Sequence, residues 1–342
     1  MMFRSSIKSL VKSAAVRGLH MSGLTCTANR VLGVIGVILA FHEIHDDPDV
    51  ELWTGCRTVF LERCIRWLRK TGWEIVTLGE AVERLHQNTR TPRFAVLTFD
   101  DGYQDNLSHA LPILRREQAP FIIYVPTGAI TRELFAWWLG LRELFRVNEK
   151  VEIAAMDRWF SCADLPSKMR SLASASRWVH KNYRRISDLR ETFLAYRVSL
   201  ETLCDRYFMN EDELRLLARE PFASIGGHTV THPALSLLDP TDALREMVDN
   251  RTYLQERSGV DVTDLAYPFG NPLACGLREA RLAAQAGFRT AATTSNRSLF
   301  IQNQHDFFTL PRVSIHPHWT LAHVDAAING VTVPAVRNLV RN

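Results

Sequence analysis

The sequence predicts an α/β fold built on a parallel sheet, either open or closed into a barrel. Two observations predict it: apolar runs of strand length alternate with segments of helical spacing, and polar motifs directly follow several of those runs. The 342 residues are 46% hydrophobic and 23% charged, which excludes a disordered or low-complexity chain. Because α/β barrels spend roughly 200 to 250 residues on one unit, the length allows one large domain with additions.

The apolar run 31–40 is the first predicted strand. Five of its ten residues are β-branched, which favours a buried strand. The run could also pass for the core of a signal peptide, but it leads straight into the polar sequence FHEIHDD, and its ten residues are too short to span a bilayer. We therefore expect a strand here and no cleavage near Ala40.

Strand and helix signals then alternate to the end of the chain. Gly72 ends the first helical segment, Thr77 and Glu80 form a capping box, and Asp239-Pro240 and Gly259 bound a later helix. The expected helices cover 60–68, 81–85, 107–114, 133–145, 240–258 and 274–286. The expected strands after the first cover 74–78, 94–99, 121–125, 223–225, 263–267, 288–293 and 308–315.

The rhythm breaks between residues 147 and 210. This segment reads as a mainly helical insertion, and its basic residues form either a solvated face or a contact with an anionic ligand or a membrane. We expect a basic N-terminal helical segment over 1–30, one α/β unit over 31–330 that carries the insertion, and a C-terminal tail over 331–342.

The N-terminal segment raises a question of targeting. Residues 3–23 are basic, contain serine and lack acidic residues, as in a transit peptide, an interfacial amphipathic helix or an ordinary docked helix. The formal charge of +4 comes mainly from this segment, so we expect no nucleic-acid face. The six cysteines form no CxxC pair, which favours reduced thiols. We expect a cytoplasmic protein with peripheral membrane contact as an alternative, and export is left open.

The motif TFDDGY at 98–103 carries two adjacent carboxylates. Neighbouring side chains of a strand point to opposite faces, so Asp100 and Asp101 reach one pocket only if the strand ends there, where Gly102 allows a sharp turn. The alternative is that these carboxylates cap the following helix. Alone, the triplet DDG is weak evidence for a site.

Two further motifs follow predicted strands. In GGHTVTHP (226–233), His228 and His232 are spaced so that both can bind one cation, with a carboxylate from another strand as third ligand and one position open for water. In AYPFG (266–270), Tyr267 and Phe269 could line a sugar site, although the motif could also be only a turn. Because active groups of such folds gather where strands end, the three motifs point to one site.

Together these residues resemble the polysaccharide deacetylase family, the carbohydrate esterases with a NodB-homology domain. The resemblance runs from about Val37 to Ile315 and includes TFDDGY, FIIYVPTG, HTVTHP, YPFG and LPRVSI. It implies a distorted (β/α) barrel and a metal-dependent hydrolase that removes N-acetyl groups from an acetylated amino-sugar oligo- or polysaccharide, such as a chitooligosaccharide. The insertion matches the family least.

The resemblance also implies roles for individual residues. Asp101, His228 and His232 look like the ligands of a divalent cation, usually Zn²⁺, and Asp100 looks like the base that activates the attacking water. The backbone N–H of Tyr103 would hold the oxyanion. Trp138, with Trp137, either stacks on sugar rings or packs in the core.

The acid and the partner of the base depart from the common family pattern. The C-terminal segment offers His316 and His318 only within IHPHW, whereas VILAFHEI (37–44) looks like the acid motif of a circularly permuted subgroup. We therefore expect His42 to be the acid, with its ring across the metal from Asp100. The arginine that usually precedes YPFG is absent, and Arg312 of LPRV could take its role from a neighbouring strand.

Two other functions fit part of the pattern. An allantoinase-like relative would hydrolyse a small C–N amide with the same barrel and metal. A non-catalytic carbohydrate-binding barrel has no need of a base beside an open metal site, so the set of Asp100, Asp101, His228 and His232 argues against it.

Overall fold

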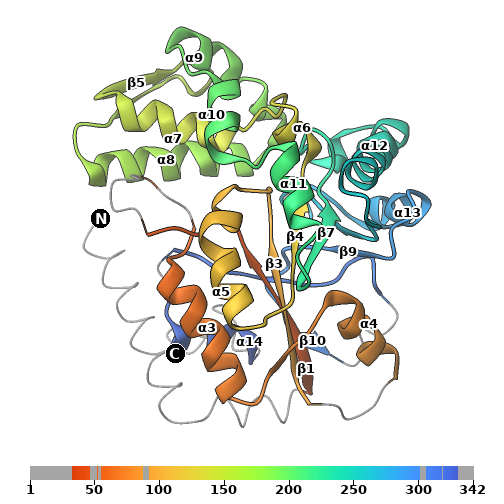
Figure 1. Ribbon diagram of the computed structural model, residues 1–342. Coiled ribbons are helices and arrows are strands. Elements are labelled where there is room, and N and C mark those ends of the chain that lie inside the picture. The colour runs from red at the N-terminus through yellow and green to blue at the C-terminus, as the bar shows by residue number, and fades with distance from the viewer. Residues whose placement is uncertain are drawn as a thin grey trace, which may run out of the picture.

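The computed structural model describes residues 33–46, 52, 55–87, 92–300, 306–317 and 319–329. Its centre is a curled sheet with the strand order β10-β1-β3-β4-β7-β8-β9, to which β11 adds beside β1 and β2 beside β3. The strands are β1 (Val34–Phe41), β2 (Glu74–Ile75), β3 (Phe94–Phe99), β4 (Phe121–Val125), β7 (Ala223–Gly227), β8 (Asp264–Ala266), β9 (Thr290–Ala292), β10 (Leu299–Phe300) and β11 (Val313–Ser314). Figure 1 shows this sheet at the centre of the lower part of the molecule.

The neighbours from β1 to β9 pair in parallel, as the strand–helix alternation predicts. The expected last strand, 308–315, shortens to β11, but its segment closes the sheet: Leu310 bridges Ala292 of β9, and Val313 pairs with Leu39 of β1. The result is the expected distorted (β/α) barrel. The run predicted as the first strand forms β1, and every residue of β1 except Ile35 is buried.

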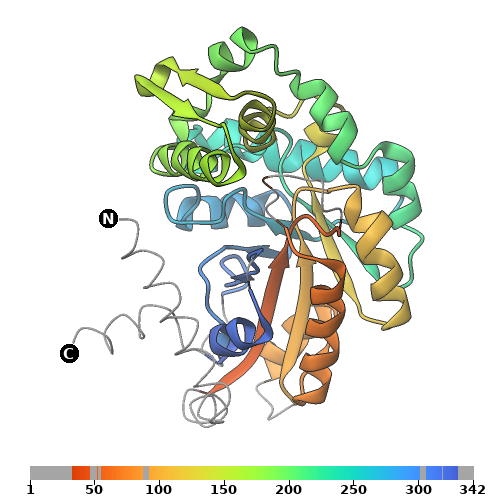
Figure 2. The same cartoon turned by 90° about the vertical axis from the view of Figure 1, so that its left-hand side faces the viewer.

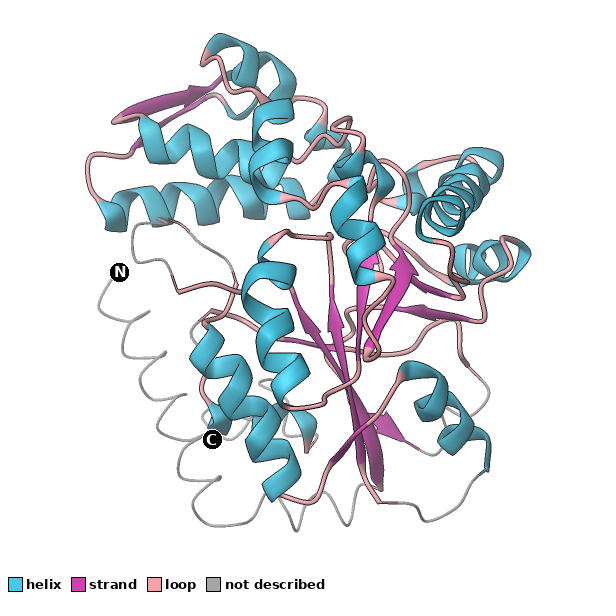
Figure 3. Ribbon diagram, in the orientation of Figure 1, coloured by secondary structure: helices cyan, strands magenta, loops and turns pink. Residues whose placement is uncertain are grey.

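Helices cover the outside of the sheet (Figure 3). They are α3 (Thr58–Lys70), α4 (Leu78–Gln87), the π-helix η1 (Asn106–Ala110), α5 (Leu111–Arg116), α12 (Pro240–Ser258), α13 (Leu277–Gln285) and α14 (Leu321–Ile328). Leu61, Ile65 and Leu68 of α3 are buried at helical spacing against the sheet, as their sequence positions predict. Asp239 caps α12 by accepting from the backbone N–H groups of Thr241 and Asp242.

A second group of helices sits over the carboxyl ends of the strands and forms a cap (Figures 1 and 2). It begins before residue 147 and, besides helices, contains the antiparallel pair of β5 (Lys150–Ile153) and β6 (Arg158–Ser161), so the expectation of a mainly helical insertion is incomplete. Its helices are α6 (Thr127–Ile130), α7 (Trp137–Val147), η2 (Ala154–Met156), α8 (Leu165–His180), η3 (Tyr183–Ile186), α9 (Leu189–Ala195) and α10 (Leu200–Tyr207), with η4 (Leu235–Leu237) nearby. The next helix, α11 (Glu211–Leu217), packs on the barrel, because Leu214 and Leu217 are buried in the core of the sheet.

The cap has a hydrophobic core of its own. Trp137, Phe145, Phe160, Val179 and Phe193 belong to it, whereas the main core lies between the sheet and its covering helices. The expectations about residues 1–30 and 331–342 lie outside the described residues. No helix in the described part of the chain has the length and apolar character needed to cross a membrane. Five of the six cysteines are described, and these are buried free thiols.

Candidate active site

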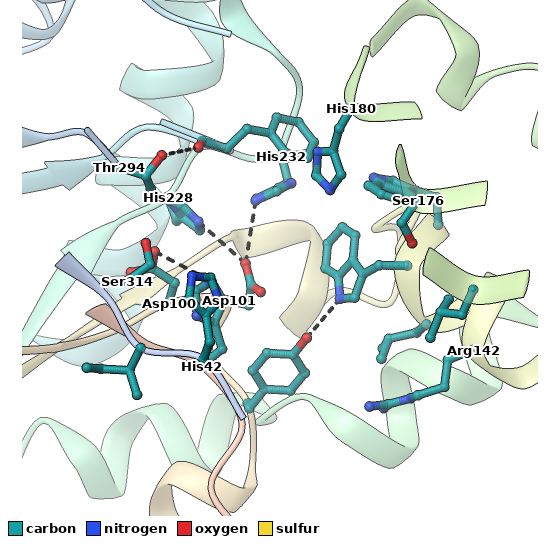
Figure 4. Close-up of a pocket in the computed structure, with 18 of the residues that line it drawn as sticks. His42, Asp100, Asp101, Arg142, Ser176, His180, His228, His232, Thr294 and Ser314 are labelled. Carbon is teal, nitrogen blue, oxygen red and sulfur yellow. Dashed lines mark hydrogen bonds and ion pairs between the residues drawn. The ribbon is translucent and has the colours of Figure 1, made fainter. Parts of the chain in front are cut away.

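A cavity of about 500 Å³ lies between the barrel and the cap (Figure 4). Its barrel wall carries charged and polar groups, and its cap wall is largely aromatic and apolar. The barrel contributes His42, Asp100, Asp101, Tyr103, His228, His232, Phe269, Thr294, Asn296, Ser314, Ile315 and His316, and the cap contributes Trp137, Trp138, Leu139, Arg142, Leu172, Ser176 and His180. The motifs at the ends of separate strands therefore meet in one place.

The turn after β3 brings both acidic side chains to the cavity. The strand ends at Phe99, and Asp101 and Gly102 adopt left-handed backbone angles, with φ of 69° and 66°. This break in the alternation lets Asp100 and Asp101 line the same cavity. A left-handed conformation is costly for a residue other than glycine, and such strain concentrates at functional sites.

A buried asparagine holds the histidine motif in place. The backbone N–H of His228 donates to Asn250 Oδ1 at 3.0 Å, and Asn250 Nδ2 donates to the carbonyl of Thr229 at 2.6 Å and to that of Val125 at 3.0 Å. His228 Nδ1 lies 2.7 Å from the carbonyl of Ala266, which can only accept, so Nδ1 carries the proton. The lone pair of His228 then lies on Nε2, which faces Asp101.

Three lone-pair donors converge in the cavity. Asp101 Oδ1 lies 3.4 Å from His228 Nε2 and 3.4 Å from His232 Nε2 (Figure 4). Burial, followed by the neighbouring His228, lowers the pKa of His232 to about 3, so His232 is neutral at ordinary pH. Buried acceptors that face one another need a cation or a proton between them, and one carboxylate with two imidazoles is a donor set that suits Zn²⁺. The three residues therefore fit a divalent metal.

Asp100 forms a buried ion pair with Arg312. Arg312 is fully buried, and its Nη1 and Nη2 donate to the two carboxylate oxygens at 2.6 and 2.7 Å. Burial alone would raise the pKa of Asp100, but the Arg312 charge and its hydrogen bonds, with the nearby histidines, lower it overall. Arg312 lies in the segment that closes the barrel between Leu310 and Val313, which places its side chain next to the end of β3.

His42 follows β1 and lines the cavity, but not where it was expected. Its Nε2 lies 4.0 Å from Asp100 Oδ2, so the ring is beside Asp100 and not across the site from it. Asn106 Nδ2 donates to the backbone carbonyl of His42 at 2.8 Å and fixes the end of the strand. β1 and β3 pair side by side, which explains why the residues that follow both strands are neighbours. His316 also lines the cavity, and His318 lies outside the described residues.

The expected substrate-binding residues separate into two groups. Trp138 and Phe269 line the cavity, each with its ring 4.8 to 5.0 Å from that of His232, and Tyr103 accepts a hydrogen bond from Trp138 Nε1 at 2.8 Å. Tyr267 does not line it, which corrects the expectation. Its side chain is 1% exposed in the main core, and its hydroxyl donates to the carbonyl of Phe308, because β8 directs this position into the core.

A second cluster of polar side chains lies behind the cavity. Glu43, His45 and Asp105 approach one another closely enough to hold a cation. A cation is already present, because Arg142 Nη1 of the cap donates to Glu43 Oε1 at 2.6 Å, and both side chains are buried. We therefore interpret this cluster as the ionic link between the cap and the end of β1.

The structure adds residues that the sequence analysis missed. Asn250 on α12 and Glu246, which accepts from the backbone N–H groups of Val230 and Thr231, both support the histidine loop from a distant part of the chain. His180 and Arg142 of the cap line the cavity. Asn250 lies three residues after Met247 and four before Leu254, on the inward side of the predicted helix. A polar residue at such a position was its only signal in the sequence. His180 and Arg142 had no local signal.

The chain matches a known protein family. The polysaccharide deacetylase family model matches residues 87–291, more than half of the chain. His42 and Arg312 lie outside that range. A stretch of 136 residues, 35% of this chain, is 30% identical to the poly-beta-1,6-N-acetyl-D-glucosamine N-deacetylase of Escherichia coli strain K12. The match spans 20% of that protein.

Solved structures show the same fold at low sequence identity. The Streptococcus pyogenes deacetylase PplD, solved with acetate, superposes with a TM-score of 0.58 at 17% identity, over 86% of this chain and 99% of that one. IcaB from Ammonifex degensii superposes with a TM-score of 0.55 at 15% identity, over 86% and 97% of the two chains. At these identities the likeness concerns the fold.

Proposed function

The chain belongs to the polysaccharide deacetylase family, and from this premise we propose that it hydrolyses the N-acetyl groups of a polymer of N-acetylglucosamine. The observation that carries the proposal is the juxtaposition in one cavity of a metal-binding donor set and a carboxylate paired with arginine. The related Escherichia coli protein is named for poly-beta-1,6-N-acetyl-D-glucosamine, which supports this polymer as the substrate.

In this proposal Asp101, His228 and His232 hold a divalent metal, with Zn²⁺ as the first candidate. When bound, the metal would polarise the acetamide carbonyl and make a water molecule a better nucleophile. The arrangement of His228 supports this role, since the carbonyl of Ala266 fixes its Nδ1–H and leaves Nε2 as a ligand atom.

Asp100 is the proposed base. Its lowered pKa keeps it ionised at neutral pH, so it can accept a proton from the attacking water. Arg312 holds the carboxylate by both oxygens and limits its rotation. The backbone N–H of Tyr103 is the proposed donor to the oxyanion that forms on the acetamide carbonyl.

His42 is the proposed acid. The nitrogen must gain a proton as the C–N bond breaks, and a histidine at the edge of the cavity can donate it. Water adds its hydroxyl to the acetyl carbon and its proton reaches the nitrogen, so the products are acetate and a free amino sugar. The 4.0 Å separation of His42 Nε2 from Asp100 Oδ2 supports passage of the proton from base to acid within the site.

Acetate release tests the function directly. The purified protein, loaded with Zn²⁺, should release acetate from β-1,6- and β-1,4-linked N-acetylglucosamine oligomers, and chelation should abolish the release. The comparison substrates are small N-acetylated amines, followed by acetate release, and allantoin, followed by loss of the substrate. Turnover of these small amides without turnover of the oligomers would contradict the proposal.

A further inference from the structure

Helix α8 presents one continuous face to the cavity and to the surface beyond it. Residues three or four positions apart lie on the same face of a helix. Leu172, Ser176 and His180 occupy such positions and line the cavity, and Leu165 and Met169 continue the face toward the start of the helix. We call these five residues the α8 strip.

The outer part of the α8 strip is open to solvent. Leu165 is 45% exposed and Met169 is 55% exposed, whereas Ser167, Ser171 and Val179 are buried where α8 packs on the cap. The strip therefore runs from Leu172, Ser176 and His180, which line the cavity, to exposed apolar side chains beyond it. An apolar face that is continuous with a binding cavity needs an explanation, because exposed leucine and methionine at helical spacing are not required for packing.

His180 at the inner end is held in one tautomer. Asn271 Nδ2 donates to the hydroxyl of Tyr183, which leaves that hydroxyl's single hydrogen for His180 Nδ1, 3.3 Å away. A neutral His180 then carries its own hydrogen on Nε2 and offers a donor. Tyr183 also stacks on Phe269, with centroids 4.1 Å apart, and the ring of Phe269 lies 4.8 Å from that of His232. Figure 4 shows His180 and His232 on neighbouring walls of the cavity.

We propose that the α8 strip binds the sugar units that adjoin the one being deacetylated, so that the enzyme selects chains of several units; this rests on the proposed function. A cavity of about 500 Å³ cannot hold a polymer, so the rest of the chain must lie on the surface next to it, and the α8 strip is continuous with the cavity. Sugar rings have polar edges and apolar C–H faces. His180 and Ser176 hydrogen-bond to hydroxyls of the first adjoining unit, and Leu172, Met169 and Leu165 pack against the faces of the next.

The order of side chains favours a sugar chain over a lipid tail or a partner protein. The donors lie at the inner end, where the first adjoining unit would have all its hydroxyls in reach. A lipid tail that lay along the α8 strip would end against His180 and Ser176, whose polar groups would lose water without gaining partners.

The test measures kcat/KM for N-acetylglucosamine oligomers from the monosaccharide to the hexasaccharide. For the natural protein kcat/KM should rise with length. In Met169→Asp and in His180→Ala the ratio of kcat/KM for the hexasaccharide to that for the monosaccharide should fall about ten-fold, mainly through KM, since about 1.4 kcal/mol corresponds to this factor. Leu216→Asp is the matched control, because Leu216 is 57% exposed on α11 and lies outside the strip. Its ratio should not change.

Several outcomes would overturn the inference. The first is that kcat/KM of the natural protein does not depend on oligomer length. The second is that the hexasaccharide-to-monosaccharide ratio of Met169→Asp equals that of the control. The third is that Met169→Asp loses binding to anionic lipid vesicles but keeps this ratio. Calorimetric binding of the hexasaccharide to Asp100→Asn, with and without Met169→Asp, separates this inference from the proposed function. Weaker binding in the double variant supports the strip even if no acetate is released.

Discussion

The two walls of the active-site cavity are built on different principles. The barrel wall carries charged and polar side chains that follow paired strands, and some of them are fixed by other segments of the barrel, as Arg312 fixes Asp100 and Asn250 of α12 fixes the turn at His228. The cap wall consists of aromatic and apolar side chains on α7 and α8, which belong to a separate hydrophobic core. The difference teaches that the proposed catalytic groups are positioned by sheet pairing, whereas the proposed sugar-binding surface is positioned by helices that pack in a separate core.

Two contacts join the walls. Arg142 of α7 pairs with Glu43 after β1, and Trp138 donates to the hydroxyl of Tyr103 after β3. Both barrel partners lie within two residues of proposed functional groups. If the two walls have these separate roles, changes in the barrel wall should remove turnover, and changes in the two contacts between the walls should mainly alter stability.

The largest effect is expected from His228→Ala. This change removes one of three proposed ligands, so metal content and acetate release should be lost together. Metal analysis of the purified variant, beside the activity assay, checks the result. His109→Ala, at an exposed histidine on η1, is the control and should keep both. Full metal occupancy in His228→Ala would show that the ligand assignment is wrong.

Asp100→Asn should come next. The amide keeps the shape of the side chain but cannot accept the proton, a role usually worth about 10²- to 10⁴-fold in rate. We expect kcat to fall by this amount while the metal stays bound. Stopped assays with metal analysis measure both. Near-normal turnover in the metal-loaded variant would mean that another group is the base.

His42→Ala should lower turnover of amides more than turnover of esters. An amine leaves only with a proton, while an alcohol of low pKa needs less protonation. Loss of the acid should therefore slow amide hydrolysis more than ester hydrolysis. We expect the amide rate to fall on the order of 10²-fold, with metal content unchanged. Comparing an N-acetylated oligomer with an aryl acetate ester checks this. Equal losses for both substrates would argue for a different role of His42, and His316 would be the next candidate.

Arg312→Lys should move the acid limb of the pH profile. Lysine keeps the charge but loses the two-pronged contact, and burial then raises the pKa of Asp100 relative to the natural protein. A base with a raised pKa is protonated at higher pH, so the acid limb of kcat/KM should shift upward, on the order of one pH unit. The same sign holds for stability: the pair stabilises the fold above the ordinary carboxyl pKa and is lost as pH falls through the lowered one. An unchanged acid limb would mean that Asp100 does not set it.

Glu43→Gln should have the smallest effect on turnover. It leaves the buried Arg142 charge without its counter-charge, which typically costs about 3 to 5 kcal/mol of unfolding free energy. Because neither side chain is placed at a reacting atom, the decrease in kcat should be smaller than in the preceding variants. Urea unfolding and acetate release measure the two effects. A loss of turnover as large as that of Asp100→Asn would show that the two walls are not separable.

The strand-end motifs could be predicted from the sequence because they obey local rules. An apolar run of strand length that ends in two carboxylates and a glycine already indicates a turn, and the alternation with helices already indicates that such ends meet at one edge of the sheet. Asp100, Asp101, His228 and His232 therefore came together where the sequence placed them. The contact of Arg312 with Asp100 was expected from the family resemblance and not from a local signal, since Arg312 lies within the predicted strand 308–315.

Only the tertiary structure decided where individual side chains point and which distant segments lie close together. Tyr267 and Phe269 lie in one motif, yet one packs in the core and the other lines the cavity, because the turn after β8 reverses the backbone between them, with φ of 62° at Phe269. The position of His42 beside Asp100 follows from the pairing of β1 with β3, and the approach of His180 follows from the docking of the cap. The sequence by itself determined the α/β fold and the barrel wall of the site, because strand ends are local signals that topology gathers in one place. The cap wall depends on contacts between segments far apart in the chain, which leave no pattern in the neighbouring residues.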